Sequence, residues 1–385
     1  VWVGSDTYHS DEEYGLTVTS TLNEVATVET EFQITDAYHT NGPANSVTGL
    51  SDGGLVITWL KPGDGIYGQR YDVTGSKAGS EFQINTDLTS THLRTDVASF
   101  KDGGFIVTWD ASNPESNPVD PEVYGRIYDG LASPIGGVFQ ISEPTLLTFS
   151  DGGTYYAPAK DATVSTLSDG GFVVTWAVNS KGIYGQQYDS SGNKTGSQFQ
   201  INTHGEKASD SDYSYKEMGS VAGLSDGGFV VTWSSARQDE NDDENERGIY
   251  GQRYDSSGNK VGIEFQINTY IAGSQLYPSV TSLLDGGFVV TWNAYDNQDG
   301  DAIGIFSQRY DSSGSKVGSE LQINTYTTSG QTQPDVTSLS DGGFVFTWTS
   351  SGQDGDVGGV YGQRYDSSGS KVGVEFQVHD NTAGH

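Results

Sequence analysis

Short apolar runs separated by glycine-rich turns recur along the whole chain. In the copy that spans residues 220–268, the second run is apolar on both faces, which is typical of a strand buried on both sides. The last run alternates, with Phe265 and Ile267 on one face, which predicts a half-exposed strand. The copy therefore predicts four antiparallel strands, at 220–224, 229–233, 249–254 and 264–268.

Two kinds of turn join these strands. An Asp-Gly-Gly turn at 226–228 links the first strand to the second, and its glycines can adopt positive φ. An Asp-Ser-Ser-Gly turn links the third strand to the fourth, and it begins at Asp255, Asp311 or Asp366 in successive copies. Its uniformity favours a hairpin turn over a metal-binding loop.

The third strand carries an arginine in several copies. A residue that recurs in this way is expected to pair between blades or on the surface, and not to act in catalysis. The recurring arginines are Arg70, Arg253, Arg309 and Arg364.

One tryptophan marks each copy, at intervals of roughly 50 to 67 residues. Such a period indicates a radial or solenoidal repeat. A β-solenoid would need much shorter coils, and a sandwich has no reason to repeat its sequence, whereas a four-stranded unit with doubly buried inner strands fits a propeller blade. The seven tryptophans predict one all-β domain, a seven-bladed β-propeller over 1–385. Its approximate blades are 1–35, 36–86, 87–142, 143–203, 204–269, 270–325 and 326–378.

The first predicted blade is degenerate and split at the termini. Trp2 stands where a second strand ends, 14–18 replaces the third strand, and 31–35 is the fourth. Either residues after His385 complete this blade or it closes with three strands. The insertion at 143–153 contains a stray Asp-Gly-Gly and is interpreted as a loop.

The composition excludes several classes of function. The formal net charge is −32, from 51 acidic and 19 basic residues, which argues against a nucleic-acid partner. This charge needs bound divalent cations, or a saline setting, to screen it. There is no cysteine, which fits bacterial export better than a eukaryotic secretory route. No apolar run approaches the length that membrane insertion requires.

The repeated text resembles the propeller repeats of very large secreted bacterial proteins that also carry hemolysin-type calcium-binding and adhesin-like modules. The text reads Leu-Ser-Asp-Gly-Gly-Phe-Val-Val-Thr-Trp at 224–233, Gly-Ile-Tyr-Gly-Gln-Arg-Tyr at 248–254 and Glu-Phe-Gln-Ile-Asn-Thr at 264–269. The resemblance covers 36–378. It implies a secreted, extracellular or cell-surface protein that is part of a larger polypeptide.

A second similarity is to the Asp box of sialidase-type propellers, Ser-x-Asp-x-Gly-x-x-Thr-Trp. Residues 225–233 keep its Ser-to-Trp distance but shift Asp and Gly forward. Because that box is structural in sialidases, the similarity supports propeller topology and not catalysis.

The predicted topology puts both repeated turns on one face of the propeller. The stretches after each tryptophan and the connectors between blades lie on the other face and carry the variation, which is where loops on a rigid frame carry function. Several of the stretches after tryptophan are acidic, with Asp-x-Asp spacing that suits calcium. Solvated surface charge is the alternative. The predicted calcium ligands are Asp299, Asp301, Asp354, Asp356, Asp239 and Asp242.

The connectors of the variable face also carry aromatic and histidine side chains. Aromatic rings beside carboxylates are typical of sugar binding, although packing between blades would also place them there. The predicted ligand-binding residues are Tyr38, His39, His92, His204, Tyr270 and Tyr326, and Tyr277 lies among them.

These features predict a calcium-dependent extracellular binding or adhesion module that recognises a glycan or another surface ligand. Two alternatives stay open. One is a polysaccharide-degrading enzyme, a glycoside hydrolase or lyase, for which the sequence singles out no carboxylate pair among 51 acidic residues. The other is a structural spacer or surface-layer module. No serine-nucleophile, zinc or phosphate-loop motif is present, so the sequence favours a protein that is not an enzyme.

Overall fold

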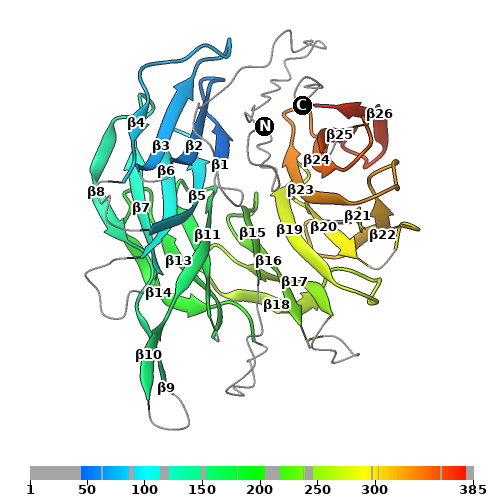
Figure 1. Ribbon diagram of the computed structural model, residues 1–385. Coiled ribbons are helices and arrows are strands. Elements are labelled where there is room, and N and C mark those ends of the chain that lie inside the picture. The colour runs from blue at the N-terminus through cyan, green and yellow to red at the C-terminus, as the bar shows by residue number, and fades with distance from the viewer. Residues whose placement is uncertain are drawn as a thin grey trace. The chain divides into compact units, whose positions relative to one another are not determined.

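The computed structural model shows β-strands and no helix in the residues that it describes (Figure 1). No helix there is long and apolar enough to cross a membrane. The described residues are 45–61, 64–85, 91–112, 121–148, 153–179, 181–203, 217–236, 238, 246–295, 298–301, 303–355 and 358–378.

The described strands fall into two compact units, which we call the N-terminal unit, within residues 35–216, and the C-terminal unit, from Glu217 onward. The N-terminal unit contains three four-stranded antiparallel sheets. Their strands are β1 (Asn45–Gly49), β2 (Leu55–Lys61), β3 (Gly65–Tyr71) and β4 (Phe82–Gln83); β5 (Thr91–Ser99), β6 (Phe105–Ser112), β7 (Pro121–Tyr128) and β8 (Pro134–Gln140); and β11 (Ala159–Thr166), β12 (Phe172–Val178), β13 (Gly182–Tyr188) and β14 (Lys194–Gln200).

The C-terminal unit contains three more sheets of the same order. Their strands are β15 (Glu217–Gly223), β16 (Phe229–Ala236), β17 (Arg247–Tyr254) and β18 (Lys260–Gln266); β19 (Gln275–Ser282), β20 (Phe288–Tyr295), β21 (Ile303–Tyr310) and β22 (Lys316–Gln322); and β23 (Gln331–Ser338), β24 (Phe344–Ser350), β25 (Gly359–Tyr365) and β26 (Lys371–Gln377).

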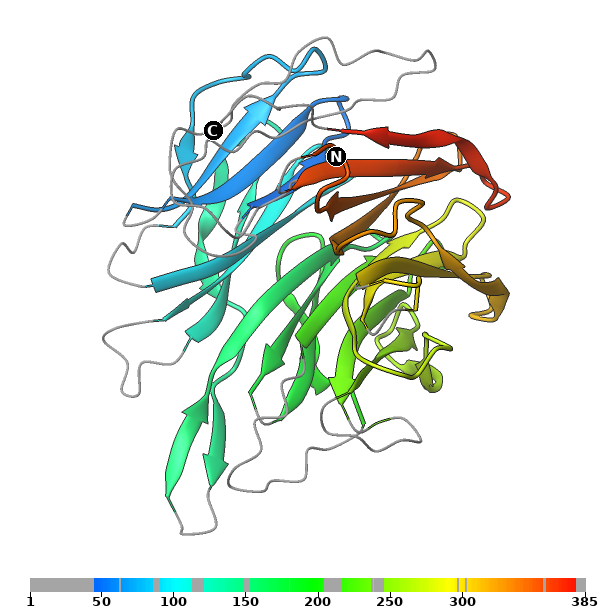
Figure 2. The ribbon, with the colours of Figure 1, turned by 45° about the vertical axis from the view of Figure 1, so that its right-hand side comes forward.

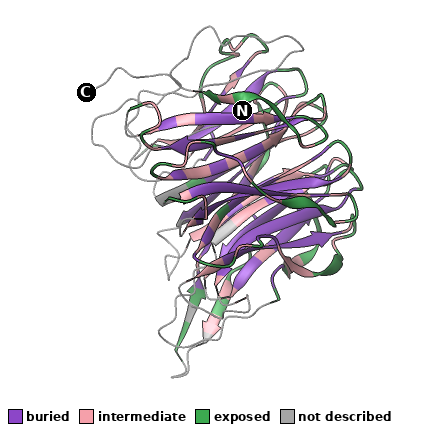
Figure 3. Ribbon diagram, turned by 90° about the vertical axis from the view of Figure 1, so that its right-hand side faces the viewer, coloured by how far each residue is buried: buried purple, intermediate pink, exposed green. Residues whose placement is uncertain are grey.

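Within each unit, neighbouring sheets meet at their first strands. β5 contacts both β1 and β11, and β19 contacts both β15 and β23. Figure 2 shows the orange-to-red sheet β23–β26 beside the yellow sheet β19–β22. The second and third strands are buried, and the fourth strands are mostly exposed (Figure 3). This is the packing of propeller blades, with the first strand innermost and the fourth outermost.

The predicted all-β fold of four-stranded antiparallel propeller blades is therefore confirmed, and the described residues form six such blades. The prediction of seven blades is not confirmed. The segments predicted for the additional blade, which are Trp2, 14–18 and 31–35, lie outside the described residues.

Two details of the predicted elements are wrong. The fourth strand of the copy at 220–268 is Lys260–Gln266 and not 264–268. Its pairing with β17 starts at Lys260, opposite Tyr254, and a bulge separates this part from the pair of Phe265 and Gly251. The insertion predicted to be a loop contains a hairpin, β9 (Thr145–Thr148) and β10 (Thr154–Ala157), which extends from the N-terminal unit in Figure 1.

The blades are held together by aromatic side chains. The six described tryptophans are at most 3% exposed. In the second and third strands, a phenylalanine stacks on the tyrosine that it pairs with, as Phe288 does on Tyr310 with ring centroids 4.6 Å apart. Phe265, from the fourth strand of the preceding blade, packs against the same Tyr310 at 5.5 Å. Each such ring pair contributes about 1 kcal/mol beyond the area that it buries.

The repeated turns are structural, as the sequence predicts. In the turn that begins at Asp255, one carboxylate oxygen accepts hydrogen bonds from the N–H groups of Ser257 and Asn259 at 2.9 and 2.8 Å. The side-chain hydrogen bond from Asn259, followed by these backbone bonds, lowers the pKa of Asp255. Hydrogen bonding of the carboxylate to its own turn explains why this sequence recurs as a hairpin turn.

The repeated arginine pairs within and between blades, as predicted. Arg253 lies 3.5 Å from the Asp226 carboxylate of its own blade, and it donates to the Ser312 carbonyl of the next blade at 2.9 Å. Arg309 and Asp285 repeat the pair in the following blade at 2.6 Å.

Candidate functional site

The first strands carry a bulge where they begin to pair with the second strands. The pairing register shifts in β5, β11, β19 and β23, where two residues lie between the paired positions, and in β15, where only Gly219 does. The repeat places one variable side chain in the equivalent position of each two-residue bulge, and we call these four the bulge residues: Arg94, Asp161, Tyr277 and Gln333. Three of them have left-handed backbones, with φ of 57° at Asp161, 55° at Tyr277 and 54° at Gln333. Bulges of this kind re-aim a side chain, and they are common beside functional sites.

In the N-terminal unit, two bulge residues from neighbouring blades form an ion pair. Arg94 Nε lies 3.1 Å from Asp161 Oδ1, and their side chains are 46% and 18% exposed. The pair therefore presents a guanidinium and a carboxylate to solvent at the inner strands of two blades.

Asp110 lies beneath this pair and fixes its geometry. It follows Trp109 in β6 and is 1% exposed. Its Oδ1 accepts a hydrogen bond from the N–H of Arg94 at 2.8 Å, and its Oδ2 accepts one from the N–H of Asp161 at 3.2 Å. One buried carboxyl group thus bonds to the bulges of both blades.

The pKa of Asp110 is raised to about 6. Burial is the main cause, and the nearby charge of Asp161 adds to it, while the backbone hydrogen bonds oppose the shift. A carboxyl with a strongly raised pKa beside a second carboxylate is a common feature of catalytic sites.

Asp96 ties the same inner strands together. Its Oδ1 accepts a hydrogen bond from the Ser46 hydroxyl of β1 at 2.7 Å, and its Oδ2 accepts one from the N–H of Val164 of β11 at 2.9 Å. These bonds join three blades through one side chain, which makes the support of the Arg94–Asp161 pair rigid.

The cluster is asymmetric, although the blades repeat. In the other described blades, the residue after the tryptophan is not a carboxylic acid; the equivalent positions hold Leu60, Ala177, Ser234, Asn293 and Thr349. Asp110 is therefore the one acidic residue at this position among the described blades. The sequence alone did not single out this asymmetric pair of carboxyl groups, Asp110 and Asp161.

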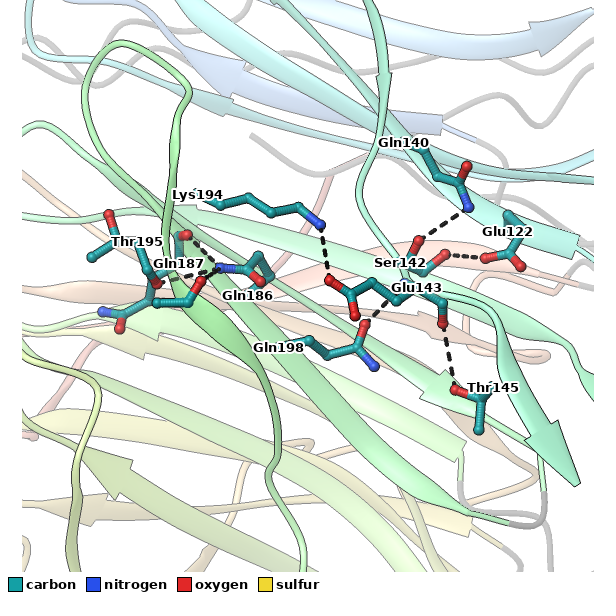
Figure 4. A network of polar contacts seen from close by, with 11 residues as sticks. Glu122, Gln140, Ser142, Glu143, Thr145, Gln186, Gln187, Lys194, Thr195 and Gln198 are labelled. Atoms are coloured by element: carbon teal, nitrogen blue, oxygen red, sulfur yellow. Dashed lines mark hydrogen bonds and ion pairs between the residues drawn. The ribbon is translucent and has the colours of Figure 1, made fainter.

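The hairpin β9–β10 leads directly into the strand that carries Asp161. Its base is anchored at Glu143, whose N–H donates to Gln198 Oε1 at 2.9 Å and whose carboxylate lies 3.5 Å from Lys194 Nζ (Figure 4). Both partners belong to β14 of the next blade, so the hairpin starts from a fixed point. Leu146 and Tyr156 face each other across the hairpin and are 51% and 40% exposed.

The described members of the predicted calcium set bond to nitrogen donors. Asp299 accepts from the N–H of Asp301 at 3.2 Å and from Asn324 Nδ2 at 3.4 Å, and Asp301 accepts from the N–H of Ser329 at 3.2 Å. Asp354 accepts from Gln377 Nε2 at 2.9 Å. Within the described ranges, no group of three or more His, Asp or Glu residues is placed to hold a metal ion. The remaining predicted ligands, Asp239, Asp242 and Asp356, lie outside the described residues.

The described members of the predicted ligand-binding set lie on three different blades. Tyr270 follows β18, and Tyr326 follows β22 and donates to the Gly352 carbonyl at 3.3 Å. His92 belongs to the N-terminal unit, where its backbone pairs with Ala111 beside the β5 bulge. The other three, Tyr38, His39 and His204, lie outside the described residues.

The sequence analysis missed Arg94, Asp110 and Asp161. A signal for Asp110 exists, because a carboxylate directly after the tryptophan interrupts a buried strand, and buried acids are rare unless they are paired. No comparable signal marks Arg94 or Asp161, because their positions depend on a bulge.

Comparison with known proteins shows the fold and nothing finer. No family model matches the chain, and no curated protein matches it. Among solved structures, a protein of unknown function from Dyadobacter fermentans is similar, with a TM-score of 0.53 and 10% identity over 77% of this chain and 84% of that one. The GH93 α-L-arabinofuranosidase of Fusarium graminearum, solved with arabinobiose, has a TM-score of 0.50 and 12% identity over 80% of this chain and 87% of that one. At such identities the likeness is to the fold alone.

Proposed function

We propose that this protein is a polysaccharide-degrading enzyme whose active site is built on Arg94, Asp110 and Asp161. The observation that carries the proposal is the asymmetric carboxyl pair on the inner strands, in which one member has a pKa raised to about 6 and the other is ion-paired with a half-exposed arginine. The buried carboxyl group fixes both bulges, and the carboxylate beside it faces solvent, so the site combines a positioning residue with a reactive one.

The exposure of each of the three side chains indicates its role in the proposed active site. Asp161 is partly exposed, so it is the carboxylate that meets the substrate and acts as the general base. It takes a proton from an attacking water or from the sugar ring, and a solvent water protonates the leaving oxygen. Arg94 has a planar guanidinium that binds hydroxyl or carboxylate oxygens of the sugar with paired hydrogen bonds. Asp110 is buried and acts as a positioning residue, since it holds the backbone of both.

The propeller fold is compatible with an enzyme that acts on a saccharide. The arabinofuranosidase named above shares the blade architecture and acts on a saccharide, but a shared fold does not carry an activity with it. The proposal therefore rests on the three side chains.

The test is incubation of the full chain with soluble polysaccharides such as arabinan, xylan, pectin and alginate. New reducing ends would show cleavage, and unsaturated products would separate elimination from hydrolysis. We expect Asp161→Asn to abolish cleavage, and Asp64→Asn, which removes an exposed carboxylate from the same unit, to leave it unchanged. Equal activity of Asp161→Asn and the wild type would refute the proposed site.

Calcium-dependent adhesion stays a second proposal. It is favoured by the loops that carry Asp299, Asp301 and Asp354, where pairs of carboxylates lie close together in the sequence. In this alternative the protein binds a glycan or surface ligand without cleaving it. Secretion and membership of a larger polypeptide stay predictions that accompany either function.

A further inference from the structure

Tyr277 is an exposed aromatic residue in a backbone conformation that aromatic residues rarely adopt. It is the bulge residue of β19, its φ is 55°, and it is 45% exposed. A bulky side chain is strained in the left-handed region, and the following Pro278 favours an extended backbone at this position instead. A tyrosine at this position therefore adds backbone strain to the folded state.

The register shift does not require a tyrosine at this position. The equivalent bulge residues, Asp161 and Gln333, support the same register shift and nearly the same φ without a ring. Asparagine or glycine would adopt this conformation at a lower cost. An exposed ring on a strained backbone is a feature of ligand-binding and active sites.

A buried amide beside Tyr277 gives a second, independent indication. Asn293 follows Trp292 in β20, and its backbone pairs with Leu276, next to Tyr277. Its side chain is fully buried, and neither its Nδ2 nor its Oδ1 has a hydrogen-bond partner in the described part of the chain. Buried polar atoms are nearly always satisfied, so this amide indicates a bound water or ligand group.

The repeat relates the backbone position of Asn293 to that of Asp110. Asn293 occupies the position that Asp110 has in the N-terminal unit, where the carboxyl oxygens accept from the two neighbouring bulges. The corresponding bulges in the C-terminal unit are those of Tyr277 and Gln333. The Gln333 side chain is itself held, because the Thr349 hydroxyl donates to its Oε1 at 3.5 Å.

We infer that Tyr277, Gln333 and Asn293 form a saccharide-binding subsite on the inner strands of the C-terminal unit. The ring stacks on the apolar face of a sugar, and the Gln333 amide supplies a donor and an acceptor for its hydroxyl groups. The Asn293 amide is fully buried, so it contributes through a bound water beneath the sugar. None of the three side chains is charged, so the subsite fits a neutral sugar residue. The class of ligand rests on the proposed function, while the site itself rests on the tyrosine and the buried amide.

The experiment measures binding of the full chain to the same soluble polysaccharides by affinity electrophoresis, in an Asp161→Asn background. Tyr277→Asn is the informative variant, because asparagine tolerates the left-handed backbone and removes only the ring. We expect affinity to fall about tenfold, which corresponds to about 1.4 kcal/mol, while the melting temperature is maintained. Tyr277→Phe should retain binding because it keeps the ring.

Leu284→Asn is the matched control. Leu284 is 69% exposed, and it lies in the turn at the other end of the same strand pair. Loss of affinity in Tyr277→Asn but not in Leu284→Asn supports the subsite, whereas equal affinity of Tyr277→Asn and its parent overturns it.

The two proposals fail separately. If the wild type binds and cleaves a polysaccharide and Tyr277→Asn changes nothing, the subsite is wrong and the active site stands. If Tyr277→Asn weakens binding but the wild type cleaves none of the polysaccharides, the proposed enzyme is wrong and the subsite stands. If the wild type binds none of them, both are overturned.

Discussion

Replacing Asp110 by asparagine removes the buried carboxyl group that holds the two bulges of the candidate site. In the folded protein the pKa of Asp110 is raised from 3.8 to about 6, so this protein binds the Asp110 proton more tightly when folded than when unfolded. Stability from this group is therefore fully present below about pH 4, and it is lost as the pH rises through about 6. Above pH 7 the folded protein carries the full cost of a buried carboxylate.

The size of this effect follows from the shift. A rise in pKa of about two units corresponds to about 3 kcal/mol, at 1.36 kcal/mol for each unit. The amide introduced by Asp110→Asn cannot titrate, so the wild type should lose about 2 kcal/mol of this total relative to the variant between pH 4 and pH 7. The absolute stability of Asp110→Asn also includes a lost hydrogen bond, because an amide nitrogen cannot accept from a backbone N–H. That loss is the same at every pH.

The assay is urea-induced unfolding of both proteins at several values between pH 4 and pH 8. All other titrating groups contribute to both curves, so the difference between the two proteins isolates Asp110. We expect the difference in the free energy of unfolding to change between pH 4 and pH 7 and to be constant above that. A difference that does not vary with pH would show that the pKa of Asp110 is not raised, and the argument for the active site would lose its main support.

Three further predictions address the blades, the ion pair and the predicted metal. Trp176→Ala should lower the free energy of unfolding by about 3–5 kcal/mol, because it empties a fully buried site; a loss below about 1 kcal/mol in urea titration would contradict the packing. Arg94→Lys should weaken polysaccharide binding, measured by affinity electrophoresis, because the single ammonium cannot make the paired hydrogen bonds of the guanidinium; binding equal to the wild type would remove Arg94 from the site. If calcium binds at Asp299, Asp301 or Asp354, EDTA at low salt should lower the melting temperature, and added calcium should restore it; an unchanged melting curve would count against the metal.

The local sequence was enough to establish the blades. Asp-Gly-Gly and Asp-Ser-Ser-Gly turns form within a few residues, and a run such as 229–233 is buried whichever blade it joins, so strand order and burial follow from the text of one repeat. The same applies to Arg253, whose partner Asp226 lies within the same copy. Repetition strengthened each of these predictions, because each copy repeats the same local argument.

The position of the candidate active site follows only from the tertiary structure. Arg94 and Asp161 come from different copies of the repeat, and they meet because bulges in two neighbouring strands bring them together. The carboxyl of Asp110 is buried between those bulges, and burial is what raises its pKa. The repeated sequence predicts only the features that its copies share. This site depends on contacts between copies and on side chains that differ among them. It could therefore not be predicted from the sequence of one repeat.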